Sequence, residues 1–124
     1  MNRNSTHLAL AILRIGFSGL LLTHGIPKIG KLFADTIEFP DPIGLGATLS
    51  LILVLIAEVV GPLFVIIGYK TKLATIPTII MMMVAAFVVH LSDPIGTKEK
   101  ALLFLIGFIA IYLAGPGKYA IDKN

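Results

Sequence analysis

The chain has 124 residues, of which 56% are hydrophobic and only 14% are charged, and its mean hydropathy is +0.95. Soluble proteins average about 25% charged residues, and a soluble domain of this size buries only roughly 60–70% of its surface, so the composition excludes a soluble globular fold and indicates an integral membrane protein. The net charge is +3, but the basic residues stand singly or in pairs between apolar stretches. This pattern is typical of the ends of membrane spans and argues against nucleic-acid binding. Cysteine is absent, which excludes disulfides and thiol chemistry within the chain.

Apolar stretches follow one another in chain order, and a spanning helix needs about 20 such residues. The predicted spans cover residues 8–29, 45–68, 73–91 and 101–114. The last is short, and it crosses the hydrocarbon core only if its flanking lysines extend to the interface. Because the connections are brief apart from residues 31–44, the sequence predicts an all-α fold: one domain over residues 1–124, built as a transmembrane up-down four-helix bundle. The first stretch contains Arg14 and lacks a cleavage-site pattern, so we expect a retained span rather than a signal peptide.

The distribution of charge predicts the orientation in the membrane. With four spans, both termini and the turn at residues 68–72 lie on one side, which carries mainly basic residues. The opposite side mixes lysines with most of the acidic residues. By the positive-inside rule, both termini are expected in the cytoplasm.

Ionisable residues inside the predicted spans are the candidate functional groups, because charges in the hydrocarbon region are costly and usually face a partner or a cavity. They are Arg14, His24, Glu58 and His90. Depths counted at about 1.5 Å per residue allow an arginine side chain to bridge the first and second spans, so we predict a buried Arg14–Glu58 pair. Pro62 is expected to kink the second helix and to free the carbonyl of Glu58. This polar layer is interpreted either as a site for a proton or a quinone-like head group, or as a pair that only fixes the helix register.

The two histidines lie at similar depths near the outer ends of the first and third spans. If they face each other, they can bind haem or pass protons; otherwise they are interfacial side chains that bond near water. No metal-ligand spacing accompanies them, so no metal site is predicted. Lys28, on the same face of its helix as Arg14, and Tyr112, near the cytoplasmic end of the fourth span, are weaker candidates for cofactor contacts.

Small residues indicate where helices approach closely. Gly16 and Gly19 lie on the side of the first helix away from its polar arc, where they allow a neighbouring helix or a second protomer to approach. Ala57 and Gly61 have the small-x-x-x-small spacing with the same meaning. Homo-oligomers are therefore one possible assembly.

Several short motifs follow one another along nearly the whole chain. They are Leu13-Arg14, Thr23-His24-Gly25-Ile26-Pro27-Lys28, Ala57-Glu58-Val59-Val60-Gly61, Gly68-Tyr69-Lys70-Thr71-Lys72-Leu73-Ala74, His90, and Gly115-Pro116-Gly117-Lys118-Tyr119-Ala120-Ile121-Asp122. In this order and spacing they resemble the DoxX family of small four-helix membrane proteins. Pro62 departs from the pattern, since a second glycine often stands there in the family.

The resemblance implies a multi-pass protein of the bacterial cytoplasmic membrane that is associated with oxidoreductase systems, such as the membrane subunit of thiosulfate:quinone oxidoreductase. By position it marks these polar residues: Arg14, His24, Lys28, Glu58, His90, Tyr119 and Asp122. Without cysteine, an oxidoreductase role requires a bound quinone, a haem or a soluble redox partner.

Two classes of function follow. The first is a membrane subunit of a quinone-linked redox system, with the Arg14/Glu58 layer as its polar site. The alternative is a non-enzymatic scaffold in the lipid bilayer that recruits a soluble partner through the acidic, proline-bearing loop at residues 33–44. A transporter ranks last, because only Pro62 suggests a discontinuous helix.

Overall fold

The computed structural model describes residues 3–122, and in this range every regular element is helical. The elements are α1 (Arg3–Ile29), η1 (Gly30–Phe33), α2 (Ala47–Leu55), η2 (Ile56–Val60), α3 (Gly61–Ile67), α4 (Thr71–Val84), η3 (Ala85–Val89) and α5 (Ile95–Ala114). η1 is a 3₁₀ turn, whereas η2 and η3 are π-helical. Since η2 joins α2 directly to α3, and η3 continues α4, the described residues form four long helical segments. The all-helical prediction is confirmed.

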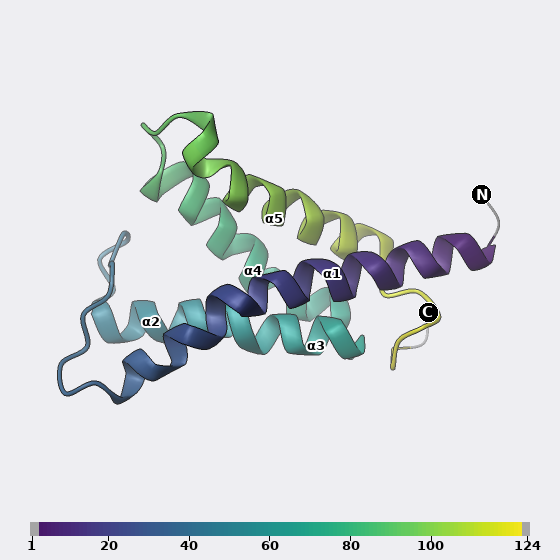
Figure 1. Cartoon of the computed structure of the whole chain (residues 1–124), viewed down its shortest axis with the longest axis horizontal. Helices are drawn as coiled ribbons and strands as arrows, with labels where there is room; N and C mark the ends of the chain where they lie inside the picture. The colour runs from purple at the N-terminus through teal and green to yellow at the C-terminus, as the bar shows by residue number, and fades with distance from the viewer. Residues whose placement is uncertain (1–2, 123–124) are drawn as a thin grey trace.

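The helical segments alternate in direction. Figure 1 shows α1 beside the α2–α3 helix, while α4 and α5 form a hairpin that diverges from α1 and α2 toward the left of the view. The C-terminal tail returns to the turn between α3 and α4, where the N–H groups of Lys70 and Thr71 donate to the carboxylate of Asp122. The beginning of α1 lies at this same end, because the N–H of Lys118 donates to Nδ1 of His7.

Among the described residues, three helical stretches are long and apolar enough to cross a membrane. They are Arg3–Phe33, Ala47–Ile67 and Thr71–Val89, which correspond to the first three predicted spans. α5 has 20 residues, but its first two turns contain Lys98, Glu99 and Lys100. Its uncharged part is therefore close to the predicted residues 101–114, and a fourth crossing stays a prediction.

The outer surface of the helices is apolar. Leu20, Ile106 and Leu113 are each more than 60% exposed. Many other large aliphatic side chains are also exposed along α1, α4 and α5. Such a continuous apolar surface requires lipid rather than water around it.

Glycines bring particular helix pairs into close contact. A Cβ on Gly61 would lie 2.7 Å from the carbonyl oxygen of Ala74, so the predicted close approach at this position joins α3 to α4. A Cβ on Gly107 would lie 2.6 Å from the ring of Phe17. Gly16 and Gly19 have no atom of the described chain within 4 Å of the same position. Contact of these two glycines with a second protomer stays a prediction.

Pro62 was predicted to kink the second helix and to free the carbonyl of Glu58; the feature that precedes it in the structure is a widened helical turn, and the carbonyl bonded outside the helix is that of Ala57. Proline has no N–H to donate, and the N–H of Gly61 donates to the carbonyl of Ile56, five residues back. The carbonyl of Ala57 is therefore released from the helix, and it accepts a hydrogen bond from Oγ1 of Thr78 at 2.5 Å. Neighbouring side chains thus stabilise the widened turn, as is usual for interrupted helices in membranes.

Candidate functional site

An ion pair joins α1 to η2. Nζ of Lys28, in the last turn of α1, donates to Oε1 of Glu58 at 2.7 Å. The Glu58 side chain is only 10% exposed and that of Lys28 is 29% exposed. Either charge alone would be strongly unfavourable in such surroundings, whereas a hydrogen-bonded pair offsets much of the desolvation cost.

Gly25 explains why the two helices come close enough for this pair. A Cβ at Gly25 would lie 2.5 Å from the carbonyl oxygen of Glu58 and 2.8 Å from its Cβ. Only a residue without a side chain allows this contact. Lys28 follows Gly25 by three residues and therefore lies on the same face of α1, one turn further on.

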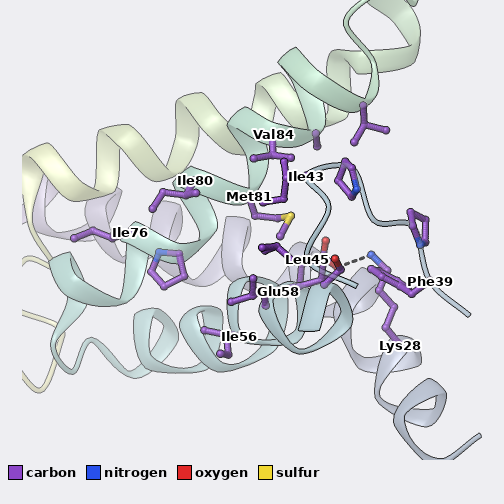
Figure 2. A pocket seen from close by; sticks show the side chains of 18 residues that line it. Lys28, Phe39, Ile43, Leu45, Ile56, Glu58, Ile76, Ile80, Met81 and Val84 are labelled. Carbon is purple, nitrogen blue, oxygen red and sulfur yellow. Dashed lines mark hydrogen bonds and ion pairs between the residues drawn. The ribbon is translucent and has the colours of Figure 1, made fainter. Parts of the chain in front are cut away.

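The ion pair lies on the wall of an apolar cavity with a volume of about 480 Å³. In Figure 2, α4 presents Ile76, Ile80 and Val84 from one side, and η2 presents Ile56 and Glu58 from the other. The polar side chains among the residues that line it are Lys28, Glu58 and Ser50. Volumes of roughly 300–1,000 Å³ and apolar walls with few polar groups are typical of small-molecule sites.

The loop before α2 forms one end of the cavity. Phe39, Ile43 and Leu45 contribute to the lining, together with the prolines beside them. Asp41 fixes this loop to α2, because its carboxylate accepts hydrogen bonds from the N–H groups of Leu45 at 2.7 Å and Gly46 at 2.8 Å and from Oγ of Ser50 at 3.0 Å. These bonds, first of all that from Gly46, lower the pKa of Asp41 because they stabilise its charged form.

The predicted Arg14–Glu58 pair is wrong. Arg14 is 1% exposed, and within residues 3–122 its guanidinium donates to main-chain carbonyls, whereas Glu58 is paired with Lys28. The acceptors are the carbonyl oxygens of Pro116 at 2.9 Å, Val65 at 3.0 Å, Ile66 at 2.8 Å and Tyr119 at 2.5 Å. The last carbonyls of a helix lack intrahelical donors and carry the negative end of the helix dipole, so the end of α3 attracts a cation.

The C-terminal tail completes this arrangement. The carboxylate of Asp122 accepts hydrogen bonds from the N–H groups of Lys70 and Thr71, both at 2.8 Å, and the bond from Thr71 is the main cause of the lowered pKa of Asp122. Gly68 has a φ of +74°, and a Cβ there would lie 2.2 Å from that of Ala120, so a side chain would prevent docking of the tail. Motifs from both ends of the chain therefore form one clamp, which consists of Arg14, the turn after α3 and the tail to Asp122.

The family model described as DoxX matches residues 9–91, which include most of α1, the Lys28–Glu58 pair and the turn after α3. The chain belongs to the DoxX family. It is similar to the inner membrane protein YqjF of Escherichia coli (strain K12), with 28% identity over 120 residues that cover 94% of this chain and 91% of that protein. No solved structure matches the chain.

The other predicted site residues of this DoxX protein have separate surroundings. The ring of His24 lies edge-on to Phe104, with 6.2 Å between the ring centroids, whereas Nδ1 of His90 bonds to Oδ2 of Asp93 at 2.8 Å. Tyr112 is exposed on the surface of α5, and Nζ of Lys72 lies 5.9 Å from the centre of its ring. Of the two weaker candidates, Lys28 lines the cavity and Tyr112 does not.

The partner of Glu58 was predicted wrongly because depth was counted along each helix separately, without regard to where two helices come into close contact. The signal for the Lys28–Glu58 pair is the motif Thr23-His24-Gly25-Ile26-Pro27-Lys28. In it a glycine, which has no side chain, precedes a lysine on the same face of the helix by three residues. The role of Arg14 has no comparable signal, because its acceptors are main-chain carbonyls.

Proposed function

We propose that this DoxX protein is the membrane subunit of a quinone-linked redox system and that the Lys28–Glu58 pair binds the quinone head group. The observation that carries this proposal is an ion pair on the wall of a cavity whose other lining residues, apart from Ser50, are apolar. The ammonium of Lys28 donates a hydrogen bond to a quinone carbonyl, while the apolar walls accommodate the isoprenoid tail. This assignment replaces Arg14 with Lys28 in the polar site and leaves Arg14 a structural role.

The chemistry of quinone reduction defines what the chain contributes. Conversion of a quinone to a quinol consumes two electrons and two protons. A partner subunit with its own redox centre supplies the electrons, because the chain has no cysteine. The ammonium of Lys28 would supply a proton to one quinone oxygen, and the carboxylate of Glu58, 2.7 Å away, would stabilise that ammonium; the second proton would come from the aqueous phase. Haem has less support, since His24 and His90 have different neighbours.

The proposed setting is the bacterial inner membrane, with four crossings and both termini in the cytoplasm. The name of the similar E. coli protein supports the location. The alternating helices and the docking of the tail beside the turn at residues 68–70 support an even number of crossings. On this topology the Lys28–Glu58 pair lies toward the periplasmic side.

Quinone binding by the purified chain tests the proposal. A short-tailed benzoquinone is titrated into protein in mild detergent and followed by isothermal titration calorimetry. Lys28→Met and Glu58→Gln are each expected to weaken binding about tenfold or more, which corresponds to about 1.4 kcal/mol. Lys72→Met, at the opposite end of the helices, is the matched control and leaves affinity unchanged.

Two outcomes contradict the quinone site. One is saturable binding that neither variant weakens, and the other is no binding by protein whose thermal unfolding shows an intact fold. Either outcome would favour the scaffold alternative, in which the loop at residues 33–44 contacts a soluble partner.

A further inference from the structure

A second hollow lies between α1 and α5. It shares no lining residue with the cavity that holds the Lys28–Glu58 pair on its wall. Its volume is about 550 Å³. α1 contributes Phe17, Leu20 and His24, while Glu99, Lys100 and Leu103 lie on the α5 side. We call this hollow the α1–α5 groove.

The α1–α5 groove changes from polar to apolar along its length. At its inner end, Phe17 packs edge-on against Phe104 with a centroid distance of 6.2 Å, and Gly107 lies directly against the Phe17 ring. At its outer end lie His24 and the charged first turns of α5. Phe17 and His24 are seven residues apart, which is about 10 Å along a helix. A membrane lipid changes from head group to acyl chain over a similar depth.

Two opposite charges at the outer end lack protein partners. Within residues 3–122, the side chains of Glu99 and Lys100 form no hydrogen bond or ion pair, although both line the groove. Lys98, one residue earlier, differs because its Nζ donates to the carbonyl of Leu91 at 3.1 Å. Residues 96, 99, 100 and 103 share one face of α5, so both free charges and the apolar part of the groove face the same way.

We propose that the α1–α5 groove binds one bilayer phospholipid whose head group carries both a phosphate and a primary ammonium, as phosphatidylethanolamine does. Lys100 donates to the phosphate, and the carboxylate of Glu99 accepts from the ammonium. The acyl chain lies along Phe17, Leu20 and Leu103. An anionic head group without an amine meets repulsion from Glu99, and a choline head group has no N–H to donate, so charge complementarity selects the ethanolamine type.

Native mass spectrometry of the full chain tests the proposal. Delipidated protein in mild detergent is titrated with phosphatidylethanolamine, phosphatidylcholine and phosphatidylglycerol of identical acyl chains. Phosphatidylethanolamine is expected to bind at least fivefold more tightly than the other two. Glu99→Gln should remove that preference, and Lys100→Gln should weaken all three lipids. Lys98→Gln is the matched control and should change none of the affinities.

Further measurements separate the lipid from its head group and the site from the fold. Glycerophosphoethanolamine, which has no acyl chains, should bind at least tenfold more weakly than the lipid. Leu103→Trp, which fills the apolar part of the groove from an exposed position, should weaken every lipid while thermal unfolding stays unchanged. Equal affinity for the three lipids, a preference that persists in Glu99→Gln, or equal losses in Lys98→Gln and Lys100→Gln would overturn the proposal.

Discussion

Replacement of Gly25 by alanine tests the contact that brings Lys28 to Glu58. The added Cβ would lie 2.5 Å from the carbonyl oxygen of Glu58, whereas ordinary contact begins near 3.4 Å. The atoms must therefore separate by about 0.9 Å, the difference between these two distances, and the obstacle is main chain rather than a flexible side-chain tip. Overpacking of this kind costs about 1–3 kcal/mol.

Gly19→Ala is the matched control on the same helix. Both substitutions gain about 0.5–1 kcal/mol of helix propensity, but the new Cβ at Gly19 meets nothing within 4 Å. Because the propensity gain cancels, the difference in unfolding free energy between the two variants isolates the clash. We expect Gly25→Ala to be less stable than Gly19→Ala by about 1–3 kcal/mol in SDS titrations from mixed micelles. The contact argument would be refuted by equal stabilities, because the two helices would then separate at Gly25 without cost.

Three further outcomes follow from the clamp and the widened turn. Arg14→Lys should lower the unfolding free energy by about 3 kcal/mol or more, because one ammonium cannot donate to all four carbonyls. Each hydrogen bond to a charged group contributes about 1.5–3 kcal/mol. A loss below about 1 kcal/mol in SDS titration would contradict this role of Arg14. Thr78→Val should cost about 1–2 kcal/mol in the same assay by leaving the carbonyl of Ala57 without its donor, and no loss would show that this bond is dispensable. The pKa of Asp122 is lower in the folded state than in the unfolded state. Its contribution to the stability of the folded state is therefore complete above the unfolded-state pKa of about 4, and it is lost as the pH falls through the lower folded-state pKa. Tail proteolysis at neutral pH should therefore be slow in the wild type and fast in Asp122→Asn, and equal rates would contradict the tail clamp.

The long elements were predictable because their signals are local. Apolar length and Gly30 place the end of α1, although Pro27 lies inside the helix and does not end it. The turn at residues 68–70 follows from glycine and flanking charge. The widened turn of η2 has a partial signal in Pro62, which withholds an N–H from the preceding turn. η3 contains only alanine, phenylalanine and valine, and nothing in that sequence indicates a π-helical turn.

The polar site was predictable in its members but not in their pairing. Counting depth along ideal helices correctly selected Arg14 and Glu58 as buried charges. Depth counting considered only other side chains as partners of Arg14. The actual acceptors are main-chain carbonyls at the end of α3 and in the C-terminal tail. Depth counting also took no account of the close approach of α1 to η2 that Gly25 permits. This approach brings Lys28 within hydrogen-bond distance of Glu58.

The four acceptors of Arg14 have a consequence for the order of biogenesis. Arg14 lies in α1, whereas the carbonyls of Pro116 and Tyr119 follow it in the chain by 102 and 105 residues. Until these two carbonyls have been synthesised, this guanidinium has at most the two α3 acceptors and must keep water or lipid phosphate around it. Nascent chains that stop before residue 116 thus retain in α1 a charge that lacks two of its four acceptors.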